Sequence, residues 1–182
     1  PDDDGFDQDS VSGSLRWAFA PRWSTNVHFT QADGTSEYDQ GLGDFDVHAD
    51  ATTRIAGWGI ERQWSADSRT QLKLARSDDR STSFTAFDTS RFNTEQTQAT
   101  LQHDWKTAIG QVIVGLESIR EEVSGTQAYA VNSRTTRAAF AGVHGQSGAH
   151  FWQANLRRDS NSQFGDANTG FASYGYQVTP NW

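Results

Sequence analysis

The segment "FWQANLRRDSNSQFG", residues Phe151–Gly165, contains the alternation of side chains that decides the fold of this chain. Its first half places apolar and polar residues on opposite faces of an extended strand. The apolar face carries Trp152, Ala154 and Leu156, and the polar face carries Gln153, Asn155 and Arg157. A soluble sheet buries its apolar face in a core, whereas a transmembrane barrel turns that face toward lipid and lines a water-filled interior with the polar face.

The composition of the whole chain favours the second arrangement. Only 35% of the 182 residues are hydrophobic and the mean hydropathy is −0.73, yet aromatic residues reach 12% and include seven Trp. A soluble domain this polar would lack a sufficient core, and a disordered chain would have few aromatic residues. A transmembrane β-barrel accounts for both properties, because lipid contacts only every second residue of each strand.

Charge and residue usage exclude several classes of protein. The formal net charge of −8 disfavours a nucleic-acid partner, since phosphate binding requires a basic surface. The absence of cysteine rules out disulfides and thiolate metal sites. No apolar run approaches the ~20 residues of a membrane-spanning helix. The chain has no signal peptide and no Met, so we expect it to be a processed or excised piece of a longer protein.

Segments with a period of two recur along the chain and predict about nine strands, each of roughly the 9–11 residues that cross a bilayer at a tilt. Besides the opening segment, their alternating apolar residues are Leu15, Trp17 and Phe19; Val27 and Phe29; Ala56, Trp58 and Ile60; Leu72 and Leu74; Ala99, Leu101, His103 and Trp105; Val112, Val114 and Leu116; Ala139, Ala141 and Val143; and Ala172, Tyr174 and Tyr176. The opposite face includes Arg16, Lys73, Asp104, Glu117, Arg157 and Asp159. We predict that this polar face lines a wet lumen.

The connections between these segments alternate between two lengths. Short ones are predicted at residues 20–22, 65–68, 107–110, 146–148 and 179–181, and long ones at 35–50, 78–91, 125–133 and 161–169. Outer-membrane barrels have short periplasmic turns and long extracellular loops. Trp23, Trp64, Trp105, Trp152 and Trp182 lie at or near the short turns, as expected of an aromatic belt at a membrane interface. The sequence therefore predicts an all-β fold, an antiparallel up-and-down transmembrane β-barrel segment.

Two stretches concentrate carboxylates at the end of the sheet that carries the long loops. They are "PDDDGFDQD", Pro1–Asp9, and "EYDQGLGDFDVHAD", Glu37–Asp50. Asp-rich loops lying side by side could supply the six to eight oxygen ligands that Ca²⁺ prefers. Solvated acidic loops without a metal are the alternative, and the spacing does not match an EF-hand.

No constellation of residues indicates covalent chemistry, so we do not expect an enzyme. The chain has no G-x-S-x-G motif, and its five His are scattered without metal-ligand spacing. On the polar face, Arg157 and Asp159 share one strand, and Glu117 and Glu121 share another. These charges predict either an ion-pair network that stiffens the wall or contacts with a plug or solute.

Several stretches, in order along nearly the whole chain, resemble the TonB-dependent receptors of the outer membrane, most closely the cobalamin (vitamin B₁₂) receptor branch. They are "DDDGF", "SEYD", "FDTSRFNTEQTQATLQ", "VGLESIREEV" and "LRRDSNSQFG" before "GFASYGY". The resemblance implies that residues 1–182 belong to the barrel domain of such a receptor, with about nine strands of a barrel of about 22 strands. It also implies location in the outer membrane of a Gram-negative bacterium.

The resemblance further implies a set of partners and a metal site. Cobalamin or another large solute would bind at the extracellular loops and pass through the barrel with energy that TonB delivers through a plug domain, which this chain does not contain. Calcium would order the binding surface. On motif position, the ligands match Asp2, Asp4, Asp39 and Asp50, whereas Asp44 and Asp46 fit less well because the spacing of their loop departs from the pattern.

Three other functions remain open at this stage. The chain could belong to a ferric-siderophore receptor of the same class, or to a passive barrel without a plug. It could also be a soluble β-sheet binding module, such as a carbohydrate-binding sandwich, in which the apolar residues would pack into a dry core.

Overall fold

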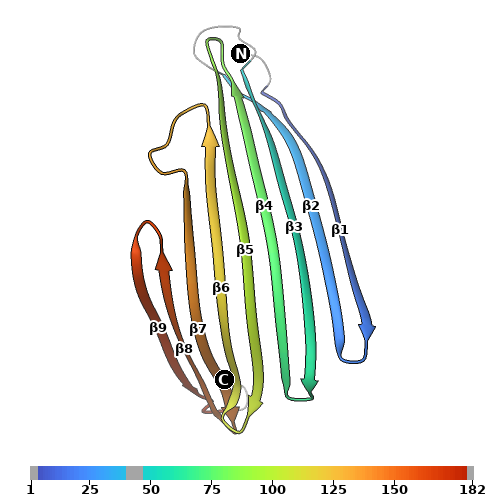
Figure 1. Ribbon diagram of the computed structural model, residues 1–182, viewed down its shortest axis with the longest axis vertical. Coiled ribbons are helices and arrows are strands. Elements are labelled where there is room, and N and C mark those ends of the chain that lie inside the picture. The colour runs from blue at the N-terminus through green and yellow to red at the C-terminus, as the bar shows by residue number, and fades with distance from the viewer. Residues whose placement is uncertain (1–3, 40–46, 180–182) are drawn as a thin grey trace.

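The chain folds into one antiparallel sheet in which each strand pairs with its neighbour in sequence (Figure 1). The computed structural model describes residues 4–39 and 47–179. The strands are β1 (Phe6–Ala20), β2 (Trp23–Glu37), β3 (His48–Ser65), β4 (Ser68–Phe84), β5 (Thr89–Thr107), β6 (Gly110–Gly125), β7 (Ser133–Ser147), β8 (His150–Asn161) and β9 (Gly165–Tyr176). This up-and-down order confirms the predicted topology. Among the described residues, no helix is long and apolar enough to cross a membrane.

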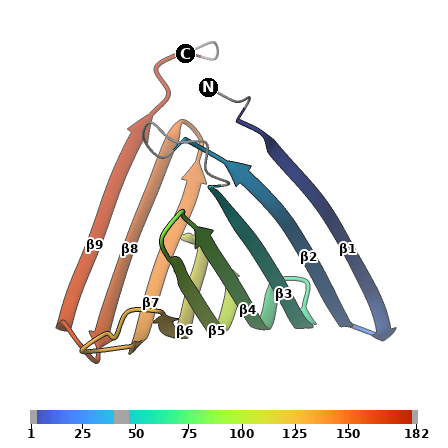
Figure 2. The same cartoon turned by 90° about the horizontal axis from the view of Figure 1, so that it is seen from above.

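The sheet curves into a trough with β1 and β9 at its two margins (Figure 2). We call the side that carries Trp152, Ala154 and Leu156 the outer face, and the side that carries Gln153, Asn155 and Arg157 the inner face. Because the strands pair in register, residues of the same face lie side by side in rows across the sheet. One row on the outer face consists of Leu72, Leu101, Leu116 and Ala139. On the inner face, Lys73, Thr100, Glu117, Ala138 and Asp159 form another.

Burial is the reverse of that in a soluble domain. On the outer face, Leu116 and Leu156 are 59% and 70% exposed. On the inner face, the side chain of Glu117 is 14% exposed and Asp104 as a whole only 4%. Within the described ranges, the buried hydrophobic residues are Val47 and Ala138 alone. Polar side chains converge on one face while apolar ones spread outward, so the predicted orientation is confirmed and a sandwich with a dry core is wrong.

Four two-residue turns join the strands at one end of the sheet, which we call the turn end (Figure 1, bottom). They lie at residues 21–22, 66–67, 108–109 and 148–149. Arg22 and Gly148 have φ angles of 67° and 58°, the left-handed conformation that tight hairpin turns require. These turns confirm the predicted short connections up to residue 149, while the last predicted turn, at 179–181, lies almost entirely outside the described residues.

At the opposite end, the loop end, two predicted long loops are wrong. Strands β4 and β5 continue through most of residues 78–91 and leave a connection of only 85–88. Strands β8 and β9 likewise leave only 162–164 as a connection. The strands are therefore longer than predicted, 12 to 19 residues. Polar residues occupy both faces near the loop end, so the hydrophobic alternation that identifies a strand disappears there while the backbone pairing continues.

Aromatic side chains gather on the outer face at the turn end. The guanidinium of Arg62 lies 3.7 Å from the ring centroid of Trp64, whose Nε1 donates to the Thr70 hydroxyl at 2.8 Å. The Nε1 of Trp152 donates to the Ile109 carbonyl at 2.9 Å. Each ring thus combines an apolar surface with a satisfied polar atom, as interfacial tryptophans do. Trp182, predicted to join this belt, lies outside the described residues.

Gly115 leaves room for the tip of the Phe140 ring, which extends over it from the neighbouring strand. A Cβ at Gly115 would come within 2.2 Å of the Phe140 ring. We expect Gly115→Ala to displace this ring and to destabilise the fold by about 1–3 kcal/mol, the usual cost of overpacking. The measurement is the urea-unfolding midpoint followed by Trp fluorescence. Gly13→Ala is the matched control, because a Cβ there meets nothing within 4 Å; equal shifts for both variants would contradict the prediction.

Candidate functional site

The first functional feature of the inner face is an ion-pair bridge across three strands. Arg157 on β8 contacts Glu117 on β6 at 2.6 Å and Asp159 at 2.8 Å. Glu117 also accepts a hydrogen bond of 2.8 Å from the side chain of Gln98 on β5. Ala138 on β7 lies between the two carboxylates in register, and its small side chain lets Arg157 reach over β7. Of the two roles predicted for these charges, this geometry supports a network that stiffens the wall.

A second network surrounds Asp104 near the turn end of the inner face. Asp104 receives hydrogen bonds from Arg69 Nε at 3.3 Å, Gln102 Nε2 at 3.1 Å and Gln111 Nε2 at 3.2 Å. Arg69 also lies 3.8 Å from Glu61. A carboxylate as buried as Asp104 is tolerated because several donors replace the lost water. The sequence places Asp104 on the polar face, with Gln102 two residues away on the same strand. Its other donors, Arg69 on β4 and Gln111 on β6, follow only from the register between strands.

The third feature is a groove of about 390 Å³ on the inner face at the loop end of β4–β7. Its lining combines apolar, amide or hydroxyl, and charged side chains. The apolar members are Phe92, Val123 and Val131; the amides and hydroxyls include Thr94, Gln96, Asn132 and Gln163; and the inner-face charges are Asp79, Glu121 and Arg134. A surface of this composition can bind a bulky solute through both apolar contact and hydrogen bonds.

Arg134 and Glu121 form the strongest polar contact in this groove. Two parallel bonds, of 2.6 and 2.8 Å, join the guanidinium of Arg134 to the carboxylate of Glu121. Both residues lie on the loop side of the apolar band, beyond the part of the strands that carries outward leucines. The hydrogen bond from Arg134 lowers the pKa of Glu121 below its ordinary value. Glu121 and Glu117 share one face of β6, as predicted, but they have different arginine partners, Arg134 and Arg157.

The predicted calcium ligands are only partly within the described residues. Asp2, Asp44 and Asp46 lie outside them. Asp50 lies on β3 and accepts a hydrogen bond of 2.7 Å from the Thr35 hydroxyl. Within residues 4–39 and 47–179, no three His, Cys, Asp or Glu side chains form a group that could hold a metal ion, so Asp4, Asp39 and Asp50 do not form a site by themselves. Calcium binding by the four aspartates therefore stays a prediction.

Comparison with known proteins gives matches in structure but not in sequence. No protein-family model and no curated protein matches the chain. A ferric enterobactin receptor from Pseudomonas aeruginosa superposes with a TM-score of 0.82 over 98% of this chain and 32% of its own, at 12% identity. The siderophore receptor PirA from Acinetobacter baumannii gives 0.68 over 97% and 32%, at 13% identity. The outer-membrane protein OmpT of Vibrio cholerae gives 0.61 over 93% and 54%, at 13% identity.

These likenesses establish the fold. The nine-stranded sheet matches part of the wall of outer-membrane β-barrels. The chain spans about a third of the length of the two siderophore receptors, at 32% of each. The matched barrels include OmpT, which is described only as an outer-membrane protein, as well as siderophore receptors. The fold alone therefore does not identify the solute.

Proposed function

We propose that this chain is part of the wall of a TonB-dependent receptor in the outer membrane of a Gram-negative bacterium, which imports a bulky solute. The observation that carries the proposal is the reversed burial of the two faces: exposed leucines outside and shielded ion pairs inside. The fold match to siderophore receptors and the ordered sequence motifs support it. The work of such a protein is recognition and gated passage, without covalent chemistry.

The proposal requires further strands and a plug. Strands β1 and β9 each pair on one side only within the described sheet, and such open edges in a membrane must be covered. The remaining strands of a larger barrel would cover them, and residues 1–182 would form one segment of that barrel domain. A plug domain elsewhere in the protein would fill the lumen, contact the inner face and receive energy from TonB.

Cobalamin is the solute that we propose first, on the sequence motifs and on the chemistry of the groove. Asp79 and Glu121 outnumber Arg134 on the inner face of the groove, so this surface is net acidic. Ferric siderophores with catecholate or carboxylate groups are anionic and would be repelled by it. Cobalamin instead has amide groups around a large apolar ring, which suit the amide and apolar lining. The ferric-siderophore alternative is favoured by the names of the structural matches.

The decisive experiment measures ligand binding to the full-length receptor that contains this chain. We expect cyanocobalamin to bind in the presence of Ca²⁺, and ferric enterobactin and ferric citrate to bind much more weakly. Isothermal titration of the purified protein with each ligand would measure this. Tight binding of a ferric chelate without cyanocobalamin binding would establish the alternative and contradict the cobalamin assignment.

The calcium proposal has its own test. If Asp2, Asp4, Asp39 and Asp50 coordinate calcium, the double change Asp4→Asn with Asp39→Asn should weaken calcium binding roughly ten- to hundredfold. Cyanocobalamin affinity should fall in parallel, and EDTA should have the same effect on the unmodified protein. Asp88→Asn is the control, because Asp88 belongs to another loop-end connection. Its side chain accepts a hydrogen bond from the Thr89 amide, and the side-chain oxygen of Asn can accept the same bond. Cyanocobalamin binding that is indifferent to EDTA and to the double change would contradict the proposal.

A further inference from the structure

The cations of the outer face have an uneven distribution along the strands. Toward the loop end, past the last outward aliphatic side chain of each strand, alternation places seven arginines on this face of β3–β8, all of them exposed: Arg54, Arg76, Arg80, Arg91, Arg120, Arg137 and Arg158. Toward the turn end, the outer face of the described strands has Arg62, which is stacked on Trp64. Both lysines of the chain, Lys73 and Lys106, lie on the inner face.

Three of these arginines lie next to one another on adjacent strands. Arg137 on β7 pairs in register with Ser118 on β6 and Ser160 on β8. Arg120 and Arg158 stand two residues from those serines on the same face, so each is a diagonal neighbour of Arg137. Diagonal neighbours in a sheet are about 7–8 Å apart, within reach of long side chains. We call Arg120, Arg137 and Arg158 the arginine cluster.

The charges within the arginine cluster are not balanced. Arg120 pairs with Glu122, and Arg158 contacts Asp166 at 3.1 Å. Arg137, between them, makes no ion pair with any residue in the described ranges. The inner-face arginines differ, since Arg157 is held by two carboxylates and Arg134 by a bidentate pair. Three exposed guanidiniums with two carboxylates leave a positive charge that favours an anion centred on Arg137.

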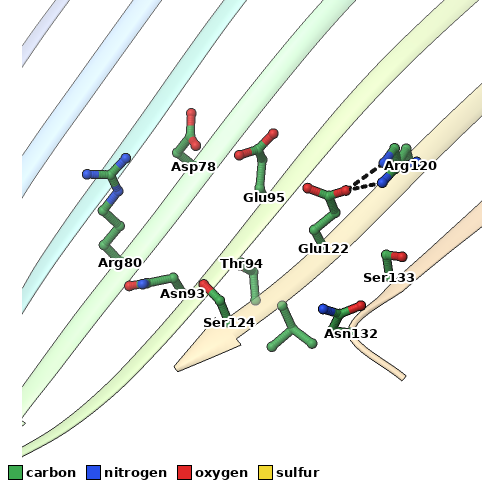
Figure 3. A pocket seen from close by; sticks show the side chains of 11 residues that line it. Asp78, Arg80, Asn93, Thr94, Glu95, Arg120, Glu122, Ser124, Asn132 and Ser133 are labelled. Carbon is green, nitrogen blue, oxygen red and sulfur yellow. Dashed lines mark hydrogen bonds and ion pairs between the residues drawn. The ribbon is translucent and has the colours of Figure 1, made fainter. Parts of the chain in front are cut away.

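The outer face next to the cluster is hollowed by a polar pocket of about 410 Å³ (Figure 3). It lies over β4–β6, where Asp78, Glu95 and Glu122 form one row across the strands. At one edge of the pocket Arg120 forms an ion pair with Glu122, and Arg80 lies at the opposite edge of the pocket (Figure 3). Carboxylates, amides and hydroxyls in such a pocket suit sugar hydroxyl groups better than acyl chains.

We propose that the arginine cluster binds the phosphate groups of a phosphorylated glycolipid in the outer leaflet of the membrane. The inference rests on the proposed location in the outer membrane. There, the loop-side margin of the apolar band lies at the level of the lipid headgroups, and the outer leaflet carries phosphorylated glucosamine lipids. The planar fork of Arg matches phosphate oxygens with two parallel bonds. The neighbouring polar pocket would receive the sugar part, which a phosphoglycerol headgroup lacks.

The test uses the full-length protein, purified from membranes and freed of bound lipid. Native mass spectrometry and titration would compare diphosphorylated lipid A, the same glycolipid without phosphates, and phosphatidylglycerol. We expect lipid A to bind best and Arg137→Gln to weaken its binding roughly tenfold or more, since the change removes charge-assisted hydrogen bonds to phosphate. Arg120→Gln and Arg158→Gln should each weaken it less, because these arginines already have carboxylate partners.

The control is Arg16→Gln, which removes an exposed arginine from the inner face and should leave lipid A binding unchanged. Equal binding of the dephosphorylated glycolipid or of phosphatidylglycerol, or unchanged lipid A binding by Arg137→Gln, would overturn the inference. Heat-modifiable electrophoretic mobility reports whether each variant forms a folded barrel. It therefore distinguishes a failure of the glycolipid site from a failure of the proposed receptor function. A folded barrel without lipid A preference contradicts only the glycolipid site, whereas a protein absent from the outer membrane contradicts the proposed function as well.

Discussion

Replacing Leu101 by arginine is expected to prevent or strongly impair assembly of the barrel. Leu101 lies on the outer face, within the apolar band and in register with Leu72 and Leu116. A charged side chain on the lipid face near the bilayer midplane costs about 2–4 kcal/mol. The folded fraction, measured by heat-modifiable mobility of the full-length protein in outer-membrane preparations, should fall sharply, and the urea midpoint of the remaining protein should decrease.

The adjacent inner-face residue provides the matched control. Gln102 donates two hydrogen bonds to Asp104, and an arginine at this position could donate to the same carboxylate. We therefore expect Gln102→Arg to assemble nearly as well as the unmodified protein. The opposite order of effects, with Leu101→Arg tolerated and Gln102→Arg disruptive, would mean that the apolar face does not contact lipid.

A phenylalanine in place of Ala138 should disrupt the inner wall. Ala138 is 7% exposed and lies between Glu117 and Asp159, beneath the path of Arg157. A large ring there overpacks the site, at a cost of about 1–3 kcal/mol, and separates Arg157 from Glu117. The expected result is a lower urea-unfolding midpoint of the full-length barrel, followed by Trp fluorescence.

Ala139→Phe is the paired control for this change. Ala139 is the next residue along β7 and is exposed on the outer face. An added aromatic ring at that position gains contact with lipid, so the midpoint should stay the same or rise. Identical losses from both substitutions would show that the position of the ring, inside or outside, does not matter, and would contradict the assignment of the two faces.

The architecture was predictable from the sequence because two independent patterns coincide. The alternation in Trp152–Arg157 assigns residues to faces, and the grouping of Trp near short turns identifies one end of the sheet. Each pattern follows from a physical requirement that acts locally, so a single strand and a single turn already display it. The inversion of polarity was also predictable, since a chain with 35% hydrophobic residues cannot fill a core between nine strands.

The site was less predictable because its geometry depends on register between strands. The bond between Arg134 and Glu121 joins residues 13 apart in sequence across the β6–β7 connection. The bridge from Arg157 to Glu117 spans 40 residues. A polar face shows which side chains point inward, but not which of them meet. The loop-end extensions of β4 and β5 were missed for another reason: with polar residues on both faces, a strand and a loop have the same composition.

The unequal strand lengths give the wall an uneven rim. Strand β5 has 19 residues and β8 only 12, a difference of about 23 Å along the strand at 3.3 Å per residue. The β8–β9 hairpin accordingly ends far below the tip of β4–β5 (Figure 1). In a barrel embedded as proposed, a solute moving over the cell surface would meet a tall barrier on one side of the opening and a low one on the other. Capture from outside would therefore be directional, and antibodies or phages would reach the tip of β4–β5 before that of β8–β9.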